Sequence, residues 1–469
     1  MSSINFVYGL LLAGFESLLL SKNLLQIKGL EARKAALEVI QAVGGGAFAD
    51  VALDRTFRVY SFKSIDKALI TELSYGAIRQ RYFLDRWIDF LGKVPAKKQP
   101  PILRWLLHLG LYQILKMERI PPAAAINTTV ELTKTLRLTK LAPVVNGILR
   151  SALRSKERGL SLPKSKNPSL ELAKNESLPL WLADELIAWK GVEDAQKIAQ
   201  AFNSVSPIDI RVNKLRAEIK DVKETFDSFG IKNQLIPGCP YGLEVPAGVG
   251  EPKKWPGYEE GKWSVQDRSS QLIAPLLGAL PGEKILDACA APGGKSTHIA
   301  ELINNNGKIW SVDRSSRRSK KISANSERLG TKCLQLLVAD SNELLVKHPE
   351  WKCFFDRILI DAPCSGLGTL ARHPDARWRM NKDNIQELVS LQSQLINSLS
   401  PLLKSGGKLV YSTCTIHPDE NFNQIKNFLQ LKSEFSLEYE KQIWPGEEEN
   451  GDGFYIAVLY KLKNLVKEK

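Results

Sequence analysis

The segment EKILDACAAPGGKSTHIAELI, residues Glu283–Ile303, determines the architecture predicted for this chain. Its apolar run ends at Asp287 and is followed by a Pro-Gly-Gly turn and by a segment whose apolar residues recur at helical spacing. Strand, turn and helix in this order are typical of the first βα unit of a nucleotide-type α/β domain. Gly293 and Gly294 lack a Cβ atom, so the backbone there can turn sharply and approach a ligand closely, beside the free amides of a helix N-terminus.

The turn does not match the two commonest glycine-rich nucleotide loops. A P-loop, G-x-x-x-x-G-K-[ST], would need glycine where the chain has Cys289, and no G-x-G-x-x-G occurs in the segment. A phosphate-cradling ATPase is therefore disfavoured. Acidic residues end the next three apolar runs, at Asp313, Asp340 and Asp361. Such carboxylates line the ligand crevice of an open parallel sheet, where the first commonly binds ribose hydroxyls; the alternative is that each caps a helix.

The net charge of +14 is concentrated in the first third of the chain. Residues 1–164 contain 25 Lys and Arg against 12 Asp and Glu, which leaves a net charge of only +1 for all later residues. A chain of 469 residues is long enough for two or three domains. The basic first third indicates a polyanionic partner, and nucleic acid is the natural one.

The six cysteines and five histidines are spread along the chain without a C-x-x-C pair. Neither a disulfide framework nor a zinc site is indicated, and we expect no metal. Free thiols predict a reducing, cytoplasmic location. Residues 4–20 are apolar but contain Glu16, lack a basic flank and a cleavage site, and are short for a membrane span. We expect an additional helix or a start site placed too far upstream, and not an export signal.

The residue pattern divides the chain into five parts. Residues 1–29 are an extra N-terminal segment, and residues 30–154 are helical throughout, with five to seven short helices in a basic bundle. Residues 155–176 are polar and form a predicted linker. Residues 177–261 predict a small α+β subdomain with short strands at 208–212 and 243–245. Residues 262–469 form the catalytic sheet, with strands expected near 284–288, 308–312, 333–338, 356–361, 407–413 and 454–460. We expect a monomer.

Two cysteines directly follow predicted strands. Cys364 lies in DAPCSG and Cys414 in YSTCT, and in an open α/β sheet both would face the crevice beside the glycine turn. A lone cysteine is most often a small buried hydrophobic residue, but two at adjacent strand ends favour a catalytic thiol. The reactive species is the thiolate, which needs neighbouring cations or helix amides to lower its pKa. Lys295, Arg372 and His373 are the candidate cations.

Several motifs resemble those of known families. DACAAPGGKS, DAPCSGLGTL and YSTCTIHPDEN, in this order, resemble the RNA cytosine carbon-5 methyltransferases, which use S-adenosyl-L-methionine. EARKAALEVI, LSYGAIRQRYFLDRWI, LYQILKMERIPPAAAINTTVEL and VNGILR resemble the helical RNA-binding domain of the NusB antitermination factor. The resemblance covers residues 30–463 and implies a Rossmann-like class I methyltransferase domain of α/β class with a seven-stranded mixed sheet. An all-α NusB-like bundle and a small α+β subdomain would precede it. The implied partner is 16S rRNA or a small-subunit assembly intermediate.

The resemblance also implies roles for individual residues. Asp313 matches the acid on the cofactor ribose, Asp340 the one near its adenine, and Asp361 the residue between the cofactor and the target base. Cys414 matches the nucleophile of the RNA enzymes. Cys364 matches the Pro-Cys cysteine, which is the nucleophile of DNA cytosine methyltransferases but assists product release in the RNA family. The cofactor loop matches Cys289, Ala290, Ala291, Pro292, Gly293, Gly294 and Lys295.

The implied reaction begins with a thiolate, because carbon 5 of cytosine is a poor nucleophile until a thiolate has added to carbon 6. We assign stabilisation of the charge at ring nitrogen 3 to Asp361. Elimination, after a base has removed the carbon-5 proton, frees the enzyme. The target base must leave its stack to be reached. Trp378, Arg377 and Arg379 are candidates to stack on or clamp the RNA, with core packing of the tryptophan as the alternative.

Two other functions stay open at this point. The same chemistry could act on transfer RNA or another ribosomal site, or the chain could be a non-catalytic RNA-binding module of the antitermination type. The intact glycines, acids and cysteines favour an enzyme. A basic cluster, Arg314, Arg317, Arg318, Lys320 and Lys321, either extends the RNA surface or is a solvated helix face.

Overall fold

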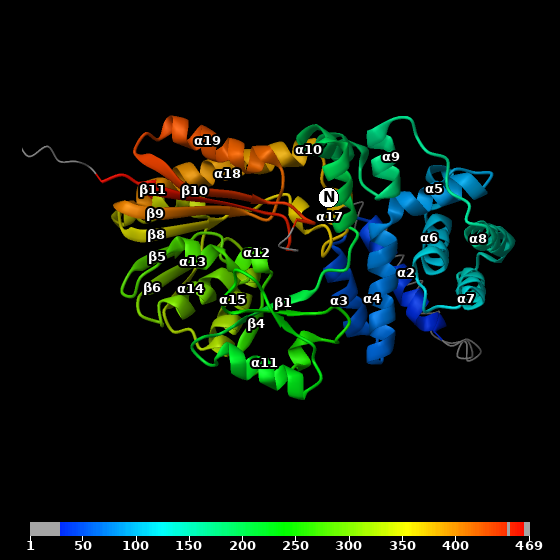
Figure 1. Cartoon of the computed structure of the whole chain (residues 1–469), viewed down its shortest axis with the longest axis horizontal. Coiled ribbons are helices and arrows are strands. Elements are labelled where there is room, and N and C mark those ends of the chain that lie inside the picture. The colour runs from blue at the N-terminus through cyan, green and yellow to red at the C-terminus, as the bar shows by residue number, and fades with distance from the viewer. Residues whose placement is uncertain (1–28, 448–450, 464–469) are drawn as a thin grey trace, which may run out of the picture. The chain divides into compact units, whose positions relative to one another are not determined.

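The computed structural model describes residues 29–447 and 451–463 (Figure 1). The chain forms two compact units, residues 1–164 and 165–469. The helix expected in residues 4–20 lies outside the described residues. None of the helices in the described ranges combines the length and the hydropathy needed to span a lipid bilayer.

The first unit is all-helical in its described part, as the sequence predicted. The triple glycine ends the first helix at Gly44, and two prolines begin the helices at 101 and 122, where a missing N–H costs nothing. The helix over residues 101–116 is buried along most of its length and forms the centre of the bundle. The α-helices are α2 (Leu30–Gly44), α3 (Ala49–Val59), α4 (Ser64–Arg79), α5 (Arg81–Leu91), α6 (Pro101–Lys116), α7 (Pro122–Thr135) and α8 (Ala142–Glu157), with short 3-10 helices η2 (Ala96–Lys98) and η3 (Thr139–Leu141).

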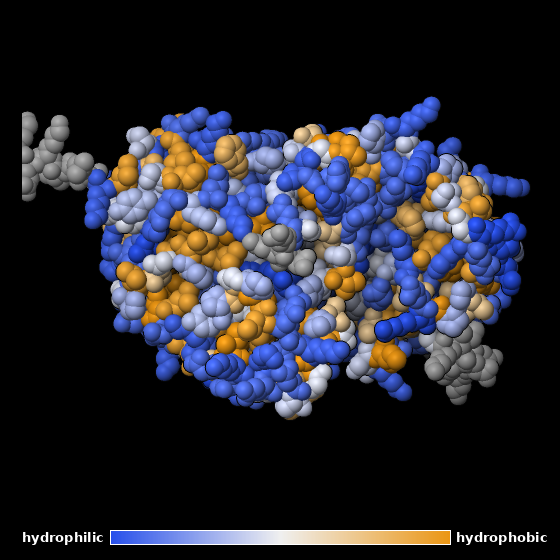
Figure 2. Space-filling model, in the orientation of Figure 1, coloured by the Kyte–Doolittle hydropathy of each residue, from blue (hydrophilic) through white to orange (hydrophobic). Residues whose placement is uncertain are grey.

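The second unit begins with two helices and a small sheet. Helix α9 (Pro168–Asn175) forms where the sequence predicted only linker, because Asn167 caps it by accepting a hydrogen bond from the Leu170 amide. Helix α10 (Leu180–Ala201) follows. Strands β1 (Ile208–Val212), β2 (Gln234–Leu235), β3 (Gly242–Val245) and β4 (Trp263–Val265) pair in the order β2-β3-β1-β4. Helix α11 (Ile219–Ser228) buries Val222 and Phe226 and presents a hydrophilic outer surface (Figure 2). The predicted α+β subdomain is confirmed.

The catalytic sheet has seven strands in the order β10-β11-β9-β8-β5-β6-β7. The five strands from β9 to β7 are parallel, and β11 is antiparallel to both of its neighbours. The chain steps outward from β5 to β7 and then returns to β8 on the other side of β5. Such a switch point opens a crevice at the carboxyl ends of β5 and β8. The strands are β5 (Lys284–Asp287), β6 (Lys308–Asp313), β7 (Leu334–Val338), β8 (Phe355–Asp361), β9 (Leu403–Thr413), β10 (Phe435–Ile443) and β11 (Phe454–Lys461).

Helices cover both faces of this sheet (Figure 1). On one face, α18 and α19 bury Leu395, Leu399 and Phe428 against the strands, and on the other α13 and α14 bury Leu277 and Ile299. The predicted Rossmann-like α/β class is therefore confirmed. The helices of this part are α12 (Arg268–Gln271), α13 (Ile273–Leu277), α14 (Gly294–Leu302), α15 (Ser316–Leu329), α16 (Leu344–Lys347), α17 (Ala376–Arg379), α18 (Lys382–Leu399) and α19 (Phe422–Leu431), with 3-10 helices η4 (Pro252–Lys254), η5 (Ser341–Glu343), η6 (Pro349–Trp351), η7 (Leu367–Thr369), η8 (Ser400–Leu402) and η9 (Pro418–Glu420).

A buried ion pair joins the small sheet to the first helix of the catalytic sheet. Arg211 of β1 donates to Glu301 of α14 at 2.7 Å and to the carbonyl of Gly294 at 2.9 Å. Both side chains are almost fully buried. Removing one partner of such a pair would leave the other charge buried and unpaired, so this contact fixes the position of the glycine turn.

Candidate active site

The glycine turn between β5 and α14 has the geometry that its sequence requires. Gly293 has φ of 100°, a left-handed value at which a side chain is strained, and a Cβ there would lie 3.1 Å from Ile322 Cγ2. Gly294 begins α14 and has room for a Cβ. Asp287 at the end of β5 is fully buried and accepts a hydrogen bond from Ser296 Oγ at 2.6 Å. Burial raises the pKa of Asp287 to about 7.

A cavity of about 260 Å³ lies at the carboxyl ends of the parallel strands. Asp313, in the cavity wall, accepts a hydrogen bond from the Ser315 amide, and Asp340 accepts one from the Asn342 amide. Asp340 therefore both lines the cavity and caps a short helix, as the alternative interpretation of the sequence had it. Seven of the residues predicted from the sequence line this one cavity: Cys289, Ala291, Asp313, Asp340, Asp361, Cys364 and Cys414. The other predicted loop residues, Ala290, Pro292, Gly293, Gly294 and Lys295, belong to the turn beside it.

The two cysteines meet at the cavity. Cys364 Sγ lies 3.2 Å from Cys414 Sγ, and neither is bonded to another sulfur. The turn that carries Cys364 follows β8 and the turn that carries Cys414 follows β9, and these strands are parallel neighbours. The hydrogen bond with Cys414, together with burial, raises the pKa of the Cys364 thiol well above its usual value. At this separation either sulfur can donate to the other.

Asp361 and Lys295 form an ion pair beside the cysteines. Lys295 Nζ donates to Asp361 Oδ2 at 2.7 Å, and Ser412 Oγ donates to Asp361 Oδ1 at 3.0 Å. Burial acts to lower the pKa of Lys295, but the attraction of Asp361 outweighs it, and a weaker attraction from Cys414 adds to the net rise. Lys295 therefore stays charged in the site that holds the two cysteines.

The other cationic candidates have different tasks. Arg372 is engaged by Asp267 at 2.9 Å and by Asp452 at 3.0 Å, and His373 is exposed. Arg377 was a candidate to clamp RNA, but its side chain is fully buried and donates to the carbonyls of Ser177 and Phe202. That prediction was wrong, because backbone carbonyls hold the guanidinium inside the fold.

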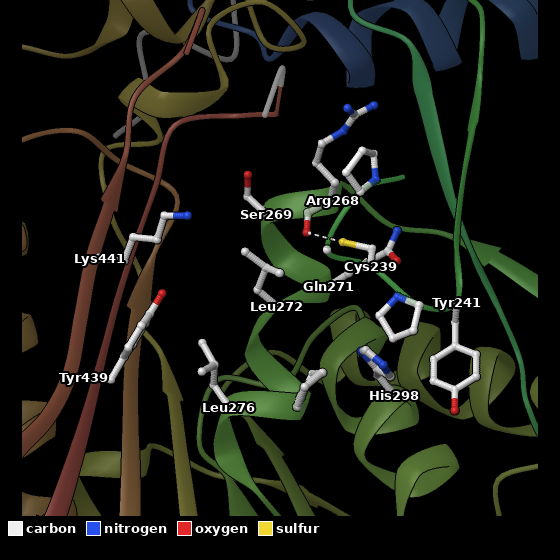
Figure 3. A pocket seen from close by; sticks show the side chains of 14 residues that line it. Cys239, Tyr241, Arg268, Ser269, Gln271, Leu272, Leu276, His298, Tyr439 and Lys441 are labelled. Carbon is white, nitrogen blue, oxygen red and sulfur yellow. Dashed lines mark hydrogen bonds between the residues drawn. The ribbon is translucent and has the colours of Figure 1, made fainter. Parts of the chain in front are cut away.

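A second cavity, of about 350 Å³, contains none of the predicted residues (Figure 3). It lies between the β2–β3 loop, helices α12 to α14 and β10. In Figure 3 Cys239 points to the Arg268 carbonyl, at 3.6 Å, and Leu272 and Leu276 supply an apolar wall. Burial holds the pKa of His298 in this wall well below its usual value, so its imidazole is neutral. The cavity lacks the paired thiols and carboxylates of the first one.

Sequence reasoning missed the buried residue that connects the cysteine turns. Glu420 in η9 is fully buried and accepts hydrogen bonds from Ser365, next to Cys364, and from Thr415, next to Cys414. It is part of the motif YSTCTIHPDEN, so its position in that motif was the available signal. No group of three or more metal-binding side chains occurs among the residues that the structure describes.

Comparison with known proteins places the chain in a family. The model of the 16S rRNA methyltransferase RsmB/F family matches residues 274–460, that of the NusB family residues 30–154, and that of the RsmF/B-like ferredoxin-like domain residues 178–250. A probable ribosomal RNA small subunit methyltransferase B of Synechocystis is 37% identical over 448 residues, which are 92% of this chain and 100% of the relative. The chain belongs to the RsmB/F family of 16S rRNA methyltransferases.

Further similarities agree with this family. The ribosomal RNA small subunit methyltransferase B of Shigella flexneri is 37% identical over 410 residues, 84% of this chain and 91% of the relative. Among solved structures, PH0851 has a TM-score of 0.76 at 27% identity and covers 92% of this chain and 99% of its own. NSun6 from Pyrococcus horikoshii, solved with SFG, has a TM-score of 0.56 at 23% identity over 62% of this chain and 100% of its own. At that identity NSun6 supports the fold alone.

Proposed function

We propose that this chain transfers a methyl group from S-adenosyl-L-methionine to carbon 5 of a cytosine in 16S rRNA, at the cytosine 967 site, through a covalent adduct with Cys414. The observation that carries the proposal is the 3.2 Å separation of the Cys364 and Cys414 sulfurs in a cavity that also holds Asp361. Two thiols and a carboxylate at one strand edge suit nucleophilic addition to a pyrimidine ring.

The residues of the cavity fit the proposed cofactor. Asp313 and Asp340 present carboxylate oxygens at the ends of β6 and β7, where ribose hydroxyls and an adenine amine would find acceptors. The left-handed Gly293 lets the backbone of the turn come close to a ligand. S-adenosyl-L-methionine, when bound, supplies an electrophilic methyl group. Cys289, Ala290, Ala291, Pro292, Gly293, Gly294 and Lys295 would form the loop beneath it.

The protein's own groups divide the work in the proposed reaction. Cys414 adds as a thiolate to carbon 6 of the cytosine. Asp361 faces ring nitrogen 3, and in its acid form it would donate a hydrogen bond there and so stabilise the negative charge that develops. After methylation and loss of the carbon-5 proton, the bond between carbon 6 and sulfur breaks and its electron pair returns to Cys414. Cys364, held as a thiol, donates a hydrogen bond to the departing sulfur.

The proposed substrate fits the charge of the first unit. Arg86 of this unit is buried and donates to the Pro163 carbonyl, but several of its basic residues are exposed: Lys97, Lys98, Arg137, Lys140, Arg150 and Arg154. Exposed lysines and arginines supply phosphate contacts without reading sequence. We therefore propose that this unit holds the RNA, and that the protein works as a monomer in the cytoplasm.

Substitution of each cysteine tests the proposal. Cys414→Ala should abolish methylation of a 16S rRNA fragment and form no covalent complex. Cys364→Ala should add to the RNA but release it slowly, so a complex that survives denaturing electrophoresis should accumulate in the presence of S-adenosyl-L-methionine. The opposite pattern, with the complex formed only by Cys414→Ala, would transfer the nucleophile to Cys364. Absence of S-adenosyl-L-methionine binding in calorimetry would reject methyl transfer altogether.

A further inference from the structure

A buried carboxylate connects the two cysteine turns. Glu420 Oε2 accepts from the Ser365 amide at 2.9 Å and from Gln392 Nε2 at 3.0 Å. Its Oε1 accepts from Ser365 Oγ and, at 3.2 Å, from Thr415 Oγ1. Ser365 and Thr415 hydroxyls are themselves 2.7 Å apart. Since each of these residues directly follows a cysteine, one carboxylate sets the separation of the two sulfurs.

Glu420 makes more contacts with the turn of Cys364 than with the turn of Cys414. Three of its bonds go to the Cys364 side, two from Ser365 and one from Gln392, whose amide also donates to the Pro363 carbonyl at 2.9 Å. From the Cys414 side the Thr415 hydroxyl donates to the carboxylate, and the Tyr411 hydroxyl donates to the backbone carbonyl of Glu420. The hydrogen bond with Cys414, burial and the charge of Cys414 raise the pKa of Cys364, and the negative charge of Glu420 adds a smaller effect in the same direction.

The cation of the site lies on the other side. The charge of Lys295 interacts with Cys414, and Lys295 donates to Asp361. The Glu420 carboxylate thus holds the turns that follow the two cysteines, whereas Lys295 is held by Asp361. Four titratable groups face Cys364: Cys414 and Tyr411 of β9 and its turn, Asp361 of β8 and Glu420 of η9. Lys295 of α14 acts through its contact with Asp361, and α18 contributes the neutral side chain of Gln392.

We infer that Glu420 is a positioning residue that holds the turns of both cysteines, so that the Cys364 thiol is directed at the Cys414 sulfur. The benefit of this arrangement rests on the proposed function, but the role of Glu420 concerns the free protein and can be measured without RNA. In the reaction, a neutral Cys364 would donate to the Cys414 thiolate both before addition and when the adduct breaks. A charged Cys364 would repel that thiolate.

Site-resolved alkylation tests this assignment. The reduced full chain is treated with iodoacetamide to low conversion from pH 6 to 10, and the modified peptides are quantified by mass spectrometry. In the wild type Cys414 should react first and Cys364 only at higher pH, because the thiolate is the species that reacts. In Glu420→Gln the pH midpoint of Cys364 should fall and the ratio of Cys364 to Cys414 labelling at pH 7.5 should rise about fivefold or more.

A matched variant separates charge from packing. Ser365→Ala removes two hydroxyl contacts in the same cluster but leaves the carboxylate, so its labelling ratio should stay at the wild-type value. An unchanged ratio in Glu420→Gln, or an equal rise in Ser365→Ala, would overturn the inference. With S-adenosyl-L-methionine and RNA, Glu420→Gln should lower kcat about tenfold or more while both KM values stay near the wild type.

A second measurement serves if Glu420→Gln does not fold. In Cys414→Ala the neighbouring sulfur is gone but Glu420 remains, so the alkylation midpoint of Cys364 should stay above the ordinary thiol value of about 8.5. A midpoint at or below that value would assign the whole effect to Cys414 and reject Glu420. If the wild type forms no covalent complex with RNA but the alkylation of its cysteines follows the expected pattern, the proposed function is rejected and the role of Glu420 stands.

Discussion

The buried carboxyl of Asp287 makes the unfolding free energy of the protein depend on pH. Burial raises its pKa to about 7, against about 3.9 for aspartate in an unfolded chain. Because the folded state binds this proton more tightly, the stabilising contribution is complete below about pH 4 and is lost as the pH rises to about 7. We expect Asp287→Asn, which cannot ionise, to gain unfolding free energy relative to the wild type across this range, by up to about 4 kcal/mol. Chemical denaturation at pH 5, 6, 7 and 8 measures the gain.

Asp356 provides a control of opposite sign. Burial would raise its pKa, but the Lys404 ammonium and the Lys284 amide outweigh burial and lower it. The stability from a lowered carboxyl pKa is present above the unfolded pKa and is lost as the pH falls through the folded one. Asp356→Asn should therefore lose stability relative to the wild type towards neutral pH. A difference for Asp287→Asn that does not change with pH would contradict the assignment of its shift.

Single residues were predicted from sequence where the motif itself placed them. Asp361 ends β8, and Cys364 and Cys414 lie in the turns after β8 and β9, so their meeting at one edge follows from the parallel topology. Glu420 was missed because its contact with Ser365, 55 residues away, exists only once the strands have paired. Arg377 was misinterpreted because an arginine near a motif gives no sign of the carbonyls that will surround it.

At the scale of elements, the turn before α14 depends on one glycine more than on the other. An Ala at position 293 would have to keep φ of 100° and press its Cβ against Ile322. A left-handed non-glycine residue costs about 1–2 kcal/mol. Gly293→Ala should therefore lower the unfolding free energy by at least that amount and weaken S-adenosyl-L-methionine binding in calorimetry.

Gly294→Ala is the matched control for the glycine turn. Gly294 begins α14, and a Cβ there would meet no atom closer than 3.8 Å, on Gln266. Since Ala is a better helix former than Gly, stability should stay level or rise by up to about 1 kcal/mol. Equal losses of stability in both variants would show that the turn tolerates no side chain at all, independent of φ.

Elements with strong periodicity were predicted, and those without it were not. Strand β1 was placed at its observed bounds, because apolar and polar residues alternate directly after Pro207. Strand β10 was missed because it is an edge strand whose alternation of apolar residues stops after Tyr439, where Glu440 and Lys441 follow Glu438 as the second and third charged residues of FSLEYEKQI. Charged edge strands avoid pairing with other chains, and for the same reason they lack a strand signal.

At the scale of the whole molecule, the charge of the first unit predicts how binding depends on salt. Each phosphate contact contributes about 0.7–0.9 to the slope of log K against log salt concentration. Arg150 and Lys140 are exposed on this unit. We expect the double variant Lys140→Gln, Arg150→Gln to lower the magnitude of the slope by about 1.4–1.8 for 16S rRNA fragments of different sequence. Fluorescence anisotropy from 50 to 300 mM KCl measures it.

An exposed lysine of the nearly neutral second unit is the control for this measurement. Lys253 lies in η4, away from the basic first unit in sequence. Lys253→Gln removes one positive charge, yet the slope should stay at the wild-type value. A double variant of the first unit that changes the affinity for one sequence only would indicate base contacts and contradict the phosphate role.

The order of the strands has one more consequence, for incomplete chains. Strand β11 lies between β9 and β10, although it is the last strand of the sheet to be made. A polypeptide interrupted between Cys414 and Phe454 would already possess every side chain that lines the first cavity. It would nevertheless leave the edge of β9 open, and an open edge recruits strands from other molecules. Truncated products would thus contain every reactive group of the site and would still aggregate before they could catalyse the reaction.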